Sequence, residues 1–148
     1  MQIIIGSDHA GFELKEAIKK YLNHDKIQFK DLGTDSTESC DYPKIGYEVA
    51  KKVASDLKNN KGILICGTGI GMSIVANKVK GIRAALCYNE ETAQLSRLHN
   101  DSNLLCLGSR QISTKLALKI TKIWLETEPS KEERHTRRVG QIRKIDKC

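Results

Sequence analysis

Short apolar runs alternate along this chain with segments of helical spacing, and that alternation most constrains the fold. The apolar runs, each bounded by glycine or polar residues, predict strands at residues 3–5, 27–32, 63–66, 82–87 and 104–107. Apolar residues at helical spacing predict helices at residues 12–22, 45–57, 72–79, 92–98 and 112–125, with a further polar helix over 130–145. Because strands that alternate with helices form parallel sheets, the pattern predicts an α/β fold around a five-stranded parallel sheet.

The composition of the strands indicates what covers this sheet. Residues 62–66 read Gly-Ile-Leu-Ile-Cys, a nearly continuous apolar run that is typical of strands with helices on both faces. Right-handed crossovers then give a doubly wound, three-layer sandwich of the Rossmann or flavodoxin type, for which we expect the strand order 2-1-3-4-5. Ligands of such folds bind at the carboxyl ends of the strands, so the functional residues are expected there.

Length and hydrophobicity favour one domain over residues 1–148. Hydrophobic residues make up 39% of the chain and are spread along its whole length, which indicates neither disorder nor a second domain. No window approaches the apolar length of a membrane span, and the first residues lack the pattern of a signal peptide. We therefore expect a cytoplasmic protein without a membrane partner.

The cysteines and the charge exclude two further classes of protein. Five widely separated cysteines without a CxxC pair or a His/Cys zinc spacing indicate neither a disulfide framework nor a structural metal. The net charge of +7 is concentrated in residues 131–148, which carry seven Lys/Arg against three Asp/Glu. Aromatic residues for base stacking are absent from this tail, so nucleic-acid binding is poorly supported and ranks below the alternative, an anionic small substrate, which fits the charge as well.

Cys66 ends the third apolar run, and the chain continues directly into a loop that contains Gly67, Gly69 and Gly71. A thiol accepts a proton when its pKa is lowered, and backbone N–H groups in a glycine-lined turn stabilise an anion. A buried structural cysteine is the plainer alternative, and it is the interpretation that we adopt for Cys87 and Cys106. At Cys66 the loop and the following helix amino terminus favour chemistry through an oxyanion.

Spacing excludes two other interpretations of this loop. Residues 67–72 lack the G-x-G-x-x-G pattern, because Met72 occupies the last glycine position, and the loop follows the third strand rather than the first. Low-molecular-weight tyrosine phosphatases carry Cys-x5-Arg on a similar fold, but the sixth residue after Cys66 is again Met72. Neither a dinucleotide site nor phosphocysteine chemistry is therefore expected.

Other strand ends carry further candidates. Asp8 and His9 follow the first strand, where Asp8 can also simply cap the next helix. Tyr42 follows the second strand, just before Pro43, and is either part of a capped loop or a wall of the site. Arg110 follows the fifth strand, where a cation faces the ligand.

Two groups of residues on the predicted helices complete the candidates. His99 lies near the end of the fourth predicted helix, where it is either a partner of the helix dipole or a site residue. Arg134 and Arg138 are four residues apart, so they share one face of the last helix, with His135 beside them. Paired guanidinium groups on one face suit a phosphate.

In order along the chain, these motifs closely resemble the ribose-5-phosphate isomerase B and galactose-6-phosphate isomerase family. The resemblance spans essentially the whole chain and rests on residues 7–12, 41–43, 66–71, 76–78, 81–84, 96–101, 108–110 and 134–139. It implies a metal-independent and cofactor-free aldose–ketose isomerase that interconverts D-ribose 5-phosphate and D-ribulose 5-phosphate through an enediolate. Some relatives carry glutamate at the position of Met72, so this chain follows the cysteine version.

The resemblance also implies a role for each candidate. Cys66 matches the general base, His99 the group that opens the furanose ring, and Asp8 a ligand of the sugar hydroxyls. The anion hole, in which Thr68 orients the reacting end, matches Gly67, Thr68, Gly69, Ile70 and Gly71. Asn100 matches a sugar ligand, and the phosphate ligands match His9, Arg110, Arg134 and Arg138. The family's site is shared across a homodimer interface, with pairing into tetramers as a further option.

Two alternatives stay open on the sequence. A six-carbon sugar phosphate, allose 6-phosphate or galactose 6-phosphate, is a possible substrate if the pocket beyond Tyr42 and Asn100 is roomy. A flavodoxin-like nucleotide-binding module is the other, although the chain lacks the dinucleotide motif and has few aromatic residues for stacking on a flavin.

Overall fold

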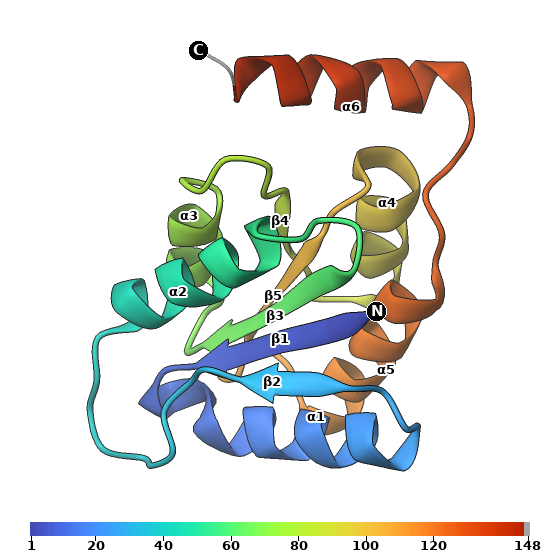
Figure 1. Ribbon diagram of the computed structural model, residues 1–148. Helices are drawn as coiled ribbons and strands as arrows, with labels where there is room; N and C mark the ends of the chain where they lie inside the picture. Colours follow the sequence, from blue (N-terminus) through green and yellow to red (C-terminus); the bar gives the residue numbers. More distant parts are fainter. Residues whose placement is uncertain (147–148) are drawn as a thin grey trace.

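The computed structural model describes residues 1–146, and these form a five-stranded parallel sheet between layers of helices (Figure 1). The strands are β1 (Gln2–Ser7), β2 (Phe29–Asp31), β3 (Asn60–Cys66), β4 (Ala84–Leu86) and β5 (Leu104–Gly108). The helices are a short 3-10 turn, η1 (His9–Gly11), and α1 (Phe12–His24), α2 (Tyr42–Ala54), α3 (Ile70–Ala76), α4 (Glu90–Asn100), α5 (Thr114–Glu126) and α6 (Glu133–Ile145). The predicted fold class is confirmed.

Alternate residues of each strand enter two separate cores, as the pleat of a strand requires. Ile3 and Ile5 pack with α1, α4 and α5 on one face, around the fully buried Trp124. Ile4 packs with α2 and α3 on the other face, where Met72 is also fully buried. Helices therefore cover both faces of the sheet (Figure 1), which explains why the central strands are apolar throughout.

The predicted strand order was wrong. The sheet runs β2-β1-β3-β5-β4, so β5 lies between β3 and β4 rather than at the edge. All five residues of β5 are buried, whereas the three residues of β4 are only half-buried. A strand that is apolar on both faces gains most from a neighbour on each side, and the shorter and less buried β4 tolerates the edge position.

Helix α6 lies above α4 and β4 in the view of Figure 1, and its bonds reach segments at the amino edge of the sheet, which is the side where the strands begin. Arg143 of α6 forms a 3.2 Å ion pair with Asp101, just before β5. The backbone N–H of Gly81, which precedes β4, donates to the carboxylate of Asp146 at 3.0 Å. The basic tail, as far as residue 146, is thus folded against the molecule at the side opposite the carboxyl edge, where the strands end.

Candidate active site

Cys66 is the last residue of β3 and is 5% exposed. The chain turns back immediately, so that the backbone N–H of Gly69 donates to the Cys66 sulfur at 3.1 Å. Gly69 is also the residue before α3, so the amino terminus of that short helix begins beside the thiol. An N–H donor and an adjacent helix amino terminus both favour negative charge on or near this sulfur.

Close backbone approaches explain the glycines of this loop. Gly69 has φ +78°, and a Cβ there would lie 2.5 Å from a methyl carbon of Leu86. A Cβ on Gly71 would lie 2.6 Å from two ring carbons of Tyr42. The loop therefore packs too tightly for side chains at these positions, and its backbone stays close to the thiol.

Tyr42 lies on the loop, because its ring covers Gly71. It occupies the first turn of α2, where Pro43 follows it, and α2 begins three residues before the start that the apolar spacing predicts. The hydroxyl-bearing ring remains 37% exposed. The sequence allows Tyr42 to be either part of a capped loop or a wall of the site, and this contact favours the second interpretation.

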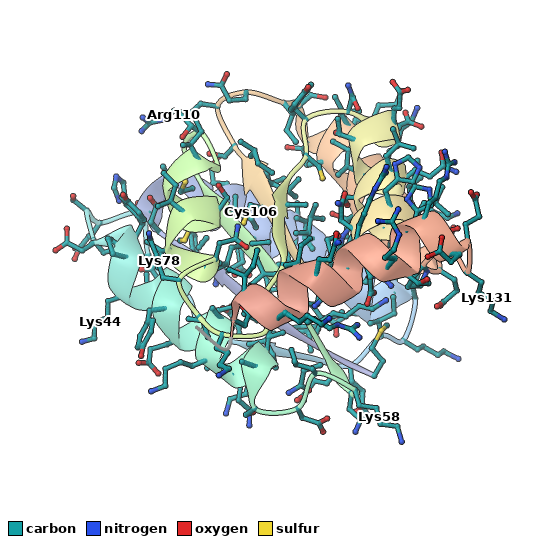
Figure 2. The ribbon with its side chains drawn as sticks, turned by 90° about the horizontal axis from the view of Figure 1, so that it is seen from above. Lys44, Lys58, Lys78, Cys106, Arg110 and Lys131 are labelled. Carbon is teal, nitrogen blue, oxygen red and sulfur yellow. The ribbon has the colours of Figure 1, made fainter. Side chains whose placement is uncertain are left out.

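Arg110 approaches the same loop from the end of β5. Its backbone N–H donates to the carbonyl of Gly67 at 3.0 Å, and its side chain provides the three atoms nearest to a Cβ built on Gly67. In Figure 2, Arg110 extends beside α3, on the side of the molecule away from Lys131, which precedes α6. The structure thus brings a cation against the loop that surrounds the thiol.

Ser109 ties three strand ends together, and sequence reasoning missed it. Its N–H donates to the carbonyl of Cys66 at 2.9 Å, and its hydroxyl donates to the carbonyl of Ala10 at 2.7 Å. The loops after β1, β3 and β5 are therefore linked through one side chain. The only signal in the sequence is its position between Gly108 and Arg110 at a strand end.

Asp8 and His9 directly follow β1, at the carboxyl edge of the sheet. Asp8 is 6% exposed and accepts the N–H of Gly11 at 3.0 Å, so the capping interpretation is confirmed. Nδ1 of His9 accepts the backbone N–H of Cys40 at 3.3 Å. That contact occupies Nδ1 and leaves Nε2 as the ring nitrogen that can bind a ligand.

The rest of the loop borders a small cavity. Thr68 accepts the N–H of Ile70 through its hydroxyl at 3.3 Å, and the Ile70 side chain is 52% exposed. The cavity has a volume of about 240 Å³, and its lining consists of Thr68, Ile70, Leu86, Cys87, Tyr88, Gly108, Gln111 and Ile112. Most of these side chains are apolar, and Cys66, Asp8 and Tyr42 are not among them.

The structure places the remaining predicted residues elsewhere. His99 and Asn100 end α4, and Arg134 and Arg138 lie on α6, all at the amino edge. Seven residues of β3 separate the two edges, which at about 3.3 Å per residue amounts to roughly 20 Å. Within one chain, His99 therefore cannot act on a molecule held at Cys66.

Local contacts at the amino edge differ from those around the thiol. The ring of His99 stacks on that of His135, with centroids 4.2 Å apart and planes inclined by 5°. Arg134 pairs with Glu132 at 2.8 Å, on the solvent-exposed surface of α6. The predicted site residues thus form two groups: a thiol group at the carboxyl edge and a histidine–arginine group at the amino edge.

Other cysteines show what distinguishes Cys66. Burial raises the pKa of the Cys87 thiol, and it raises that of the fully buried Cys106 well above the usual range. Neither sulfur lies beside a backbone N–H donor of the glycine loop. Within residues 1–146, no three His, Cys, Asp or Glu side chains are arranged to hold a metal ion. The thiol group combines a base candidate, N–H donors and a cation, which is the equipment for proton transfer beside a carbonyl.

Comparison with known proteins agrees with this geometry. The sequence profile of the Ribose/Galactose Isomerase family matches residues 3–142. Ribose-5-phosphate isomerase B of Escherichia coli (strain K12) is 45% identical over 145 residues, covering 98% of this chain and 96% of that protein. No helix in the described residues has the length and apolar character to cross a bilayer.

Solved structures with the same fold extend the match. Ribose-5-phosphate isomerase B of Clostridium thermocellum superposes with a TM-score of 0.94 at 49% identity, covering 99% of this chain and 98% of that one. The Mycoplasma genitalium enzyme, solved with bound ribulose-5-phosphate, has a TM-score of 0.94 at 40% identity and covers 99% of this chain and 96% of its own. The chain belongs to the ribose/galactose isomerase family.

Proposed function

We propose that this protein is a ribose-5-phosphate isomerase, which interconverts D-ribose 5-phosphate and D-ribulose 5-phosphate through an enediolate. The observation that carries the proposal is the Cys66 thiol at the end of β3, with the N–H of Gly69 on its sulfur. Relatives that match nearly the whole chain are named for this reaction, and one was solved with ribulose-5-phosphate. The nucleotide-binding alternative has no such support.

In this mechanism, Cys66 acts as the base. It takes the proton from C2 of the open-chain aldose, and negative charge develops on O1, where the N–H groups of residues 67–71 stabilise it. The O2 hydroxyl proton passes to O1 as the carbonyl forms at C2, and return of the first proton to C1 gives the ketose. Asp8 binds sugar hydroxyls, while His9 and Arg110 bind the phosphate.

We further propose that two copies of the chain complete each site. His99, Asn100, Arg134 and Arg138 of one copy would meet the thiol group of the other, because roughly 20 Å separates the two edges within a chain. Exposed apolar side chains beside the loop support this assembly: Ile70, Ile74 and Tyr88 are each more than half exposed. An interface would cover them. A tetramer is not required for this arrangement.

A cytoplasmic location is the remaining part of the proposal. Cys40, Cys66, Cys87 and Cys106 are free thiols among residues 1–146, which suits a reducing compartment. A free thiol at residue 66 is also what the mechanism requires.

The experiment compares turnover of ribose 5-phosphate, allose 6-phosphate and galactose 6-phosphate in the presence of a chelator. We expect the highest kcat/KM with ribose 5-phosphate, and a loss of roughly a hundred- to ten-thousandfold in kcat for Cys66→Ala. Cys106→Ala, which removes a fully buried thiol from the neighbouring strand on the same face of the sheet, is the control and should retain kcat. Full activity in Cys66→Ala would refute the base assignment, and a higher kcat/KM for a hexose phosphate would refute the substrate.

A further inference from the structure

The stacked pair of His99 and His135 joins α4 to α6. The rings are nearly parallel, at 5°, and their centroids are 4.2 Å apart, which is van der Waals contact over much of both faces. His135 is 5% exposed, so this ring is part of the packing between the two helices. His99 therefore cannot rotate about its side-chain bonds without losing the stack or moving His135.

The other feature of His135 is a polar atom without a partner. Its Nε2 is buried and has no hydrogen-bond partner among residues 1–146. A buried polar atom left in this state costs free energy, so an apolar ring such as that of Phe should pack in this place at least as well as imidazole. A cavity of about 110 Å³ lies beside the pair and is lined by both rings, Asp101 and Arg143 among others.

Burial and the charges around His135 favour the neutral form of its ring. Burial lowers the pKa of its ring, and the neighbouring His99 and Arg134 lower it further, with Arg138 acting in the same direction. Glu132 opposes them. Asp101 and Arg143, which line the same cavity, already pair with each other. The stack holds the His99 ring against a planar surface, which restrains the orientation of that ring.

We propose that His135 is a positioning residue for His99 in opening the furanose form of the substrate, an inference that rests on the proposed function. Opening breaks the bond between C1 and the ring oxygen, gives that oxygen a proton and removes one from the C1 hydroxyl. Protons and electrons therefore balance without a further reactant. The step needs a nitrogen of the His99 ring directed at one substrate oxygen, and the stack with His135 fixes that orientation.

The test uses His135→Ala, which removes the stacked plane, and His135→Phe, which keeps it. We expect kcat for ribose 5-phosphate to fall about ten- to a hundredfold in His135→Ala, with KM changed less than about threefold. His135→Phe should retain at least about a third of the wild-type kcat. His24→Ala, in which an exposed histidine on α1 is removed, is the matched control and should leave kcat unchanged.

A binding measurement distinguishes the positioning of His99 from a general disruption of the site. Ribulose 5-phosphate is acyclic, because its C5 oxygen carries the phosphate, so its affinity does not depend on ring opening. In a Cys66→Ala background, adding His135→Ala should leave its Kd within about threefold. A parallel loss of this affinity would show a merely structural role and overturn the inference.

Two further outcomes would also overturn it. One is wild-type kcat in His135→Ala. The other is a His135→Phe kcat as low as that of His99→Ala, which would assign the role to Nε2 rather than to the stacked plane. This last comparison decides the matter even if His135→Ala does not fold. A wild-type protein inactive on ribose 5-phosphate would instead refute the proposed function itself.

Discussion

Gly69 has two properties at once: a left-handed backbone with φ +78°, and an N–H within 3.1 Å of the Cys66 sulfur. A residue with a Cβ at this position would contact Leu86 at 2.5 Å, so the loop would have to move away from β4 and β5. The chemistry proposed for the thiol therefore depends on a residue that has no side chain of its own.

Gly69→Ala should reduce kcat roughly a hundredfold, because the N–H moves off the sulfur, and destabilise the protein by about 1–3 kcal/mol. Gly140 is the matched control, since a Cβ there meets nothing within 4 Å and the residue lies inside α6. Gly140→Ala should stabilise the protein by about 0.5–1 kcal/mol. Turnover assays and urea unfolding check both, and equal effects at the two glycines would contradict the close-approach explanation.

His9 is positioned by a backbone group rather than by a side chain. The N–H of Cys40 contacts its Nδ1 from the loop that joins β2 to α2, thirty-one residues away. Sequence reasoning selected His9 on its position after a strand and on the family resemblance, but neither indicates which ring nitrogen is free. That assignment follows only from the contact with Cys40.

At the scale of elements, a charged network holds α1 against the end of β2. Lys15 is 1% exposed and pairs with Asp31, which also accepts Lys19 at 2.9 Å and the N–H of Gly33 at 2.9 Å. Burial raises the pKa of the Asp31 carboxyl, but the hydrogen bonds from Lys15, Lys19 and Gly33 outweigh it and lower the pKa. The network anchors the start of the loop that reaches His9.

Asp31→Asn should destabilise the protein by about 2–3 kcal/mol, because the buried Lys15 then keeps only the more exposed Glu16, at 3.2 Å, as a charged partner. Part of Asp31 remains exposed, which keeps the loss below that of a fully buried pair. Asp56→Asn removes an exposed carboxylate that bonds to its chain neighbours Lys58 and Asn59, and it should hardly change the unfolding midpoint. Equal midpoints for the two variants in urea would show that Lys15 finds another partner.

The attachment of α6 to α4 should depend on pH. Because the folded pKa of His135 is lowered, the unfolded chain, with a histidine pKa of about 6.5, binds the proton more tightly. The stabilisation is therefore present above about pH 6.5 and is lost as pH falls through the lower folded pKa. Urea unfolding between pH 7 and pH 5 should show a steeper loss for the wild type than for His135→Phe. The same slope in both would exclude His135 as the titrating group, and His24→Ala should keep the wild-type slope.

At the scale of the whole molecule, the division of the site between two edges gives a direct test of assembly. Mixing inactive Cys66→Ala and His99→Ala chains, followed by unfolding and refolding, should restore roughly a quarter of wild-type activity. Half of the randomly formed dimers then contain both variants, and one of their two sites has an intact thiol and an intact His99. No recovery would mean that each chain builds its site alone.

The amino-acid sequence by itself determined the fold class, the family and the thiol beside a glycine loop. These depend on local patterns: strand runs, helical spacing and motifs within a few residues of one another. The strand order could not be predicted from the sequence, because the pattern shows that β5 is apolar but not which strands lie beside it. The sequence analysis also identified candidate residues at both edges of the sheet, but not the distance between them. That distance depends on the end of the sheet at which each loop lies, which the crossovers decide. Only the tertiary structure placed His99 away from Cys66 and against His135, because contacts between distant segments arise from packing.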